Sequence, residues 1–122
     1  MDDRAFLREA YEQALKSYRE GGLPIGAVMV ENGAVIARGH NRRVQSGDPI
    51  AHGEMDCFRQ AGRRKRYDTV TLYTTLSPCM MCAGTVLQFG VKRVVVQPRA
   101  VVTPAVRDEL KAKKIELIFE SK

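Results

Sequence analysis

The spacing of apolar and polar positions divides the first part of the chain into one helix and two strands. From residue 6 to residue 19, apolar side chains recur at intervals of three and four, which predicts a helix with one apolar face. Strand-like runs follow at residues 25–30 and 34–39, and Asn32 and Gly33 lie between them. An Asn-Gly step between two such runs is a strong hairpin signal, so we expect the two strands to pair antiparallel.

The rest of the chain alternates between helical and strand patterns. Residues 41–47 are predicted as a loop, after which Asp48 and Pro49 resemble an N-cap and first helical residue of a helix that continues to residue 60. The remaining predicted strands are residues 69–75, 91–97 and 115–119, and the remaining predicted helices are residues 77–89 and 104–113. Helices between strands make the later strands parallel and cover both faces of a sheet. The predicted fold is therefore α/β, a three-layer α/β/α sandwich with a five-stranded mixed sheet.

Length and composition indicate one domain, residues 1–122, with no membrane partner. The chain of 122 residues lies near the commonest domain size, and it has no apolar run of the roughly 18 residues that a membrane span needs. The acidic N-terminal residues lack the basic and apolar regions of a signal peptide, and an odd count of three cysteines fits a reducing compartment. We therefore expect a cytoplasmic protein.

A basic run, Arg63, Arg64, Lys65 and Arg66, contributes to the net charge of +6. Such a charge balance is compatible with an anionic partner. Surfaces that bind nucleic acid usually add stacking aromatic side chains, and only Tyr67 lies beside this run. We interpret the run as a solvated turn, with nucleic-acid binding as the alternative.

Two cysteines near the predicted start of a helix are candidates for metal binding. Cys79 and Cys82 are three residues apart, so both lie on one side of the helix, where its first unpaired amides stabilise ionised sulfur. A thioredoxin-like redox pair uses the same spacing after a strand, and a structural zinc site would need four Cys or His ligands. Neither alternative requires an acid elsewhere in the chain.

A histidine and a glutamate at the start of the other helix complete the pattern. His52, with Cys79 and Cys82, would give three ligands and leave one tetrahedral position open, as in a catalytic zinc site that binds water. Glu54, two residues beyond His52, is placed to accept that water's proton. Singly, each residue has a structural explanation, such as a helix cap or a buried thiol. Together, His-x-Glu followed by Pro-Cys-x-x-Cys is the signature of zinc deaminases.

The chain resembles the cytidine-deaminase-like superfamily of zinc-dependent deaminases. The resemblance covers residues 23–96, through the segments "LPIGAVMV", "GHN", "AHGE", "TLYTTLSPCMMCAG" and "GVKRVVV". It implies a cytidine-deaminase-like fold in which Zn²⁺ is held by His52, Cys79 and Cys82 and Glu54 shuttles protons. It also implies that Asn41 binds the substrate ring.

The same resemblance assigns further substrate contacts and a reaction. It implies that the backbone of Gly53 and Ser77 lines the pocket and that Ile25 packs on the ring. The glycine at position 53, "RGHN" and "YTTLSPC" are most similar to deaminases of free cytosine. We therefore expect hydrolytic deamination of a small nucleobase, cytosine to uracil with release of ammonia, by a homodimer.

Three alternatives follow from the same residues. The resemblance extends to guanine deaminases and to tRNA adenosine deaminases, which convert adenosine to inosine, and the basic run would then hold RNA. An inactive protein that keeps zinc for folding is the third, but folding would require neither Glu54 nor Asn41.

Overall fold

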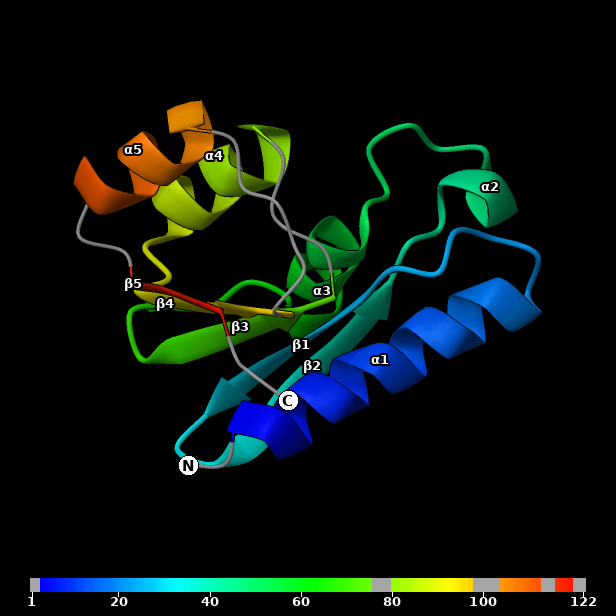
Figure 1. Cartoon of the computed structure of the whole chain (residues 1–122), viewed down its shortest axis with the longest axis horizontal. Coiled ribbons are helices and arrows are strands. Elements are labelled where there is room, and N and C mark those ends of the chain that lie inside the picture. The colour runs from blue at the N-terminus through cyan, green and yellow to red at the C-terminus, as the bar shows by residue number, and fades with distance from the viewer. Residues whose placement is uncertain (1–2, 76–79, 98–103, 113–115, 120–122) are drawn as a thin grey trace.

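The structure is a computed structural model that describes residues 3–75, 80–97, 104–112 and 116–119, and its helices lie on both sides of a sheet (Figure 1). Within these residues, five strands form one mixed sheet in the order β2-β1-β3-β4-β5. The strands are β1 Gly26–Glu31, β2 Ala34–His40, β3 Val70–Thr74, β4 Arg93–Val96 and β5 Glu116–Phe119. The helices are α1 Asp3–Arg19, α2 Arg43–Ser46, α3 Gly53–Ala61, α4 Met80–Phe89 and α5 Pro104–Ala112.

The sheet is antiparallel on one side of β3 and parallel on the other. β1 pairs antiparallel with both β2 and β3, whereas β3, β4 and β5 are parallel to one another. The hairpin between β1 and β2 turns at Asn32 and Gly33, with φ angles of 52° and 77°, as a tight two-residue turn requires. The predicted antiparallel hairpin, the α/β class and the mixed sheet are confirmed.

Two apolar clusters join the helices to the two faces of the sheet. On one face, α1 packs Leu7 and Ala10 against the sheet. On the other face, the core combines side chains of α3 and α4 with strand residues, among them Phe58, Val86 and Leu72. The sheet therefore lies between two helical layers, with α1 on the side opposite α4 in Figure 1.

The buried face of α1 differs from the predicted apolar stripe. The buried positions are Leu7, Ala10, Ala14 and Ser17, while three residues predicted on the apolar face are exposed, namely Tyr11, Leu15 and Tyr18. The helix packs through small residues because it lies close to β1: a Cβ atom on Gly26 would lie 2.2 Å from the carbonyl oxygen of Ala10. Large side chains are therefore displaced to the solvent side.

Two predictions about the segment before α3 are wrong. Residues 41–47, predicted as a loop, contain the short helix α2. The helix predicted to open at Asp48 begins instead at Gly53, because the Asp48 carboxylate accepts a hydrogen bond from Ile50 N (3.0 Å) in a local turn. The following backbone then pairs with the segment between β2 and α2, where Arg42 N donates to the carbonyl of Ala51 (2.8 Å).

Helix α3 is held very close to β2. An added Cβ atom at Gly39 would lie 2.4 Å from the backbone nitrogen of Cys57 and 2.7 Å from its Cα. Only a residue without a side chain allows this approach. The position of α3 on the sheet is thus fixed by backbone contact. In the part of the chain that the structure describes, no helix has the length and apolarity that crossing a membrane demands.

Candidate active site

The structure brings His52 and Cys82 together from two different helices. His52 is the N-cap residue of α3 and has extended backbone, but its imidazole makes no capping hydrogen bond. Capping of α3 therefore does not explain the presence of a histidine at this position. Cys82 lies in the first turn of α4 and is fully buried. The Nδ1 atom of His52 and the Sγ atom of Cys82 are 3.6 Å apart.

This separation fits two ligands of one zinc ion. A nitrogen and a sulfur that bind tetrahedral Zn²⁺ at about 2.1 Å and about 2.3 Å lie about 3.6 Å from each other. The pKa of His52 is lowered from 6.5, mainly by burial and also by the charge of Arg43, so the imidazole is neutral and able to bind a metal. Cys79 and Ser77 lie outside the described residues, and the described residues contain no group of three potential ligands.

Glu54 is a buried carboxylate beside this pair. Its exposed fraction is 3%, and burial raises its pKa to about 7, although hydrogen bonds from the backbone and from Cys82 act in the opposite direction. A carboxyl group with a pKa near the working pH both accepts and donates protons efficiently. Its place in the first turn of α3 follows from the helix start at Gly53.

Three residues predicted to contact substrate are neighbours. Asn41 N donates to the carbonyl of Ile25 (2.9 Å), and a Cβ atom on Gly53 would lie 3.4 Å from Ile25 Cγ2 and 3.6 Å from Asn41 N. The side-chain oxygen of Asn41 accepts a hydrogen bond from Arg43 N (3.0 Å). Its Nδ2 group has no hydrogen-bond partner among the described residues, so it is available as a donor.

Residues that the sequence pattern did not single out surround Asn41. Ser17 Oγ, from α1, donates to the carbonyl of Asn41 (2.8 Å), and His40 Nδ1 lies 3.1 Å from the same oxygen. Asp56, from α3, contacts both residues next to Asn41. The sequence offered one indication of a role for Ser17, since it is a polar residue spaced three positions after Ala14 on the buried face of α1. For Asp56 it offered none, because acidic residues are common in the first turn of any helix.

Two members of the basic run are paired within the fold. Arg64 binds Glu31 (2.7 Å) and lies over the ring of Tyr67, and Arg66 forms an ion pair with Asp68. Only part of the positive charge of the run is left for an external partner. This pairing supports the interpretation as a solvated turn.

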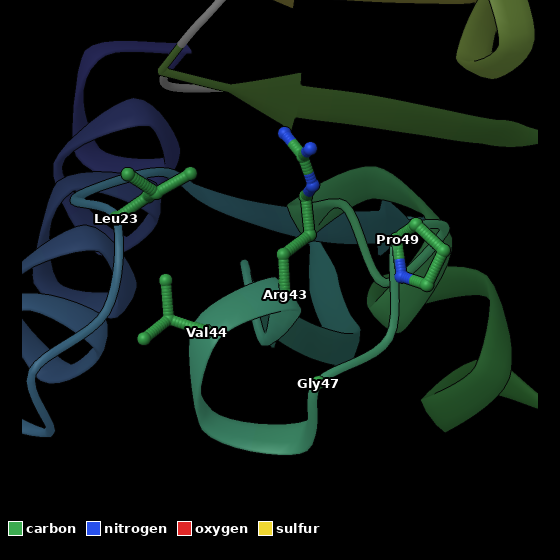
Figure 2. Close-up of a pocket in the computed structure, with 5 residues that line it drawn as sticks. All are labelled: Leu23, Arg43, Val44, Gly47 and Pro49. Carbon is green, nitrogen blue, oxygen red and sulfur yellow. The ribbon is translucent and has the colours of Figure 1, made fainter.

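A surface pocket of about 390 Å³ lies beside α2, the short helix that follows Asn41. It is lined by Leu23, Arg43, Val44, Gly47 and Pro49, and in Figure 2 the Arg43 side chain extends from α2 with Leu23 and Pro49 on either side of it. The volume falls within the range of small-molecule sites. The pocket combines apolar walls with one positive charge.

Comparison with known proteins gives relatives that act on different bases. The chain is 50% identical over 97 residues to the cytosine deaminase of Candida albicans, covering 77% of this chain and 65% of that protein. It is 44% identical over 96 residues to the tRNA-specific adenosine deaminase of Bacillus subtilis, covering 76% and 60%. The structure of guanine deaminase from Bacillus subtilis superposes with a TM-score of 0.76 and 35% identity, covering 90% of this chain and 71% of that one.

The chain spans less than two thirds of the length of these two sequence relatives. Within it, residues 1–97 match the family described as the cytidine and deoxycytidylate deaminase zinc-binding region. The matched part contains the His52–Cys82 pair and Glu54, and its fold agrees with that of the guanine deaminase. The chain therefore belongs to the cytidine and deoxycytidylate deaminase family, whose cofactor is Zn²⁺.

Proposed function

We propose that the protein is a zinc-dependent hydrolase that deaminates an amino-substituted nucleobase, with free cytosine as the substrate. The observation that carries this proposal is the buried Glu54 carboxylate beside the His52–Cys82 pair. Buried carboxylates with a raised pKa are typical of catalytic acid–base groups. In this proposal His52, Cys82 and Cys79 hold the metal.

The chemistry divides between the metal and Glu54. Zinc, when bound in such a site, activates a water molecule for attack on the amidine carbon of the ring. Glu54 accepts a proton from that water and delivers it to the ring nitrogen. It then takes the second proton from the hydroxyl group that has added to that carbon and transfers it to the amine, so that the C–N bond breaks and cytosine and water give uracil and ammonia. A pKa of about 7 suits both directions of transfer.

The substrate wall is proposed to consist of Ile25, Asn41, Gly53 and Ser77. Asn41 presents an N–H donor, which suits a ring acceptor such as a carbonyl oxygen. Gly53 adds no side chain to the wall, and the neighbouring Ile25 offers an apolar surface to the ring. The higher identity to the cytosine deaminase also supports cytosine.

Glu54→Ala tests the proposed function. We expect the variant to bind as much zinc as the wild type and to lose at least about a hundredfold in deamination rate, because the carboxylate moves protons and is not a metal ligand. Glu12→Gln, on the exposed side of α1, is the matched control and should keep full activity. Ammonia release from cytosine, guanine, adenine and their nucleosides would identify the base. Full activity of Glu54→Ala would contradict the role.

A second candidate is tRNA adenosine editing, favoured by the 44% identical relative and the net charge of +6. A salt-dependent gel shift with tRNA separates the two, since binding through phosphates weakens steeply as salt rises. The predicted homodimer and the cytoplasmic location stay predictions.

A further inference from the structure

Asp56 is a buried carboxylate whose two oxygens contact the residues on either side of Asn41. Its exposed fraction is 1%. One oxygen, Oδ2, accepts a hydrogen bond from the backbone nitrogen of His40 (3.0 Å), and the other, Oδ1, lies 3.0 Å from Nε of Arg42 in an ion pair. Burying a carboxylate is unfavourable unless both oxygens are satisfied. These two contacts, named here the Asp56 clamp, offset part of that cost: Oδ2 is hydrogen-bonded, whereas Oδ1 has the ion pair with Arg42 but no hydrogen bond among the described residues.

The Asp56 clamp links the segment around Asn41, a proposed substrate contact, to α3, the helix that carries Glu54. Asp56 follows Glu54 by two residues on α3, the helix that starts directly after His52. Asn41 belongs to a different part of the chain, just after β2. The clamp is therefore a direct polar link between the segment that presents Asn41 and the helix that carries Glu54.

Asn41 itself is held at several atoms. Its backbone nitrogen donates to Ile25 O, its carbonyl accepts from Ser17 Oγ, and its Oδ1 accepts from Arg43 N. The clamp adds contacts at both neighbouring residues, so the direction of the remaining Nδ2 group is set by contacts from α1, from Ile25 just before β1, from α2 and from α3. A displacement of about 1 Å in a positioning group can reduce catalysis by about a hundredfold.

We propose that Asp56 is a positioning residue: through His40 and Arg42 it fixes the Asn41 amide relative to Glu54, so that the ring is held in register with the proton-transfer group. The catalytic part of this inference rests on the proposed function. A residue that served the helix dipole alone would be exposed at the helix start and would not contact both neighbours of Asn41. The clamp is specific to this site because both its contacts flank the same residue.

The test compares Asp56→Asn with Asp68→Asn. The first variant can still accept from His40 N but no longer attracts Arg42, whereas the second removes a carboxylate from an exposed arginine pair elsewhere. For Asp56→Asn we expect KM for the base to rise roughly tenfold or more with zinc content unchanged, and for Asp68→Asn we expect no change. An unchanged KM in Asp56→Asn would overturn the proposal.

A double-mutant cycle distinguishes positioning from general stabilisation. If Asp56 acts through Asn41, Asp56→Asn should change KM by less than about twofold in an Asn41→Ala background. Effects that multiply would show that Asp56 acts independently, and would overturn the proposal. Should Asp56→Asn fail to fold, Arg42→Gln removes the other half of the ion pair at a side chain that is 34% exposed, and the same cycle applies to it.

Hydrogen exchange gives a reading that does not depend on activity. Backbone amides of residues 39–43 should exchange faster in Asp56→Asn than in the wild type or Asp68→Asn, because Arg42 loses its ion pair and the hydrogen bond from His40 N then ends on a neutral, weaker acceptor. If the wild type released no ammonia from any base, the proposed function would fail. In that case the exchange rates would still test whether Asp56 holds residues 39–43 in place. Equal exchange rates in all three proteins would overturn the proposed positioning role of Asp56.

Discussion

Replacing Gly39 by alanine tests the closest contact in the fold. The φ angle of Gly39 lies outside the left-handed region, so its backbone conformation suits any residue and only space is limiting. The new Cβ would lie 2.4 Å from Cys57 N and 2.7 Å from Cys57 Cα, and both are backbone atoms of α3 that cannot rotate away. Relief of the overlap requires α3 to move outward by about 1 Å, since carbon atoms in contact lie roughly 3.5 Å apart.

The magnitude follows from this displacement. Overpacking of a rigid core site destabilises a protein by about 1–3 kcal/mol. For a domain of this length each kcal/mol lowers the melting temperature by about 4 °C, which gives a decrease of about 4–12 °C. Because α3 begins directly after His52, the same movement changes the 3.6 Å separation between His52 Nδ1 and Cys82 Sγ. Zinc affinity should therefore decrease together with stability.

The assay is urea unfolding combined with zinc titration of the folded protein. Gly84→Ala provides a matched control, because a Cβ atom there would contact nothing within 4 Å and the residue lies inside α4. That variant should gain about 0.5–1 kcal/mol from the better helix propensity of alanine. Equal stability of Gly39→Ala and wild type, within about 0.5 kcal/mol, would refute the close packing of α3 on β2.

Three further predictions concern α1, the substrate wall and the metal. Asp3→Asn should lower the free energy of unfolding by about 1–2 kcal/mol at neutral pH, because Asp3 loses its paired hydrogen bonds to Arg93. That hydrogen bonding holds the pKa of Asp3 below 3.8, so the stabilisation is present above this pH and disappears as the pH falls below it, which denaturant curves at pH 7 and pH 3 would show. Gly53→Ala should fold normally, since its methyl group would meet Ile25 at an ordinary 3.4 Å, yet change the preference among bases in the ammonia assay; an unchanged preference would place Gly53 away from the substrate. Removal of zinc by a chelator should abolish activity and lower the melting temperature, and added Zn²⁺ should restore both; full activity in metal-free protein would contradict the metal's role.

Local chemistry explains which parts of the fold were predictable. The hairpin was predictable because Asn32 and Gly33 tolerate the positive φ angles of its turn whatever surrounds them. The start of α3 was not predictable, because Asp48 and Pro49 form a good helix start by sequence. The turn that replaces it, in which Ile50 N donates to the Asp48 carboxylate, becomes favourable only when Arg42 N donates to the carbonyl of Ala51. Such long-range pairing has no signature within a short window of sequence.

In the candidate site, too, some residues were predictable from the sequence and others were not. His52, Glu54 and Cys82 were identifiable because the zinc-deaminase motif requires those residue types at those spacings. The contact of Asp56 with both neighbours of Asn41 depends on how β2 and α3 pack, and their closeness at Gly39 is a property of the folded chain. Contacts that depend on packing are thus harder to predict from sequence than the residues of a sequence motif.

The sheet order places two of the proposed substrate contacts apart from one proposed zinc ligand. Ile25 and Asn41 adjoin the antiparallel hairpin, whereas Cys82 belongs to the helix that crosses over into the parallel half. In the proposed site, substitutions in the hairpin and its flanking turns would therefore alter this part of the wall while His52 and Cys82 keep their spacing. With the proposed site, an architecture of this kind would let one zinc centre serve different heterocycles, in line with relatives named as cytosine, guanine and tRNA-specific adenosine deaminases.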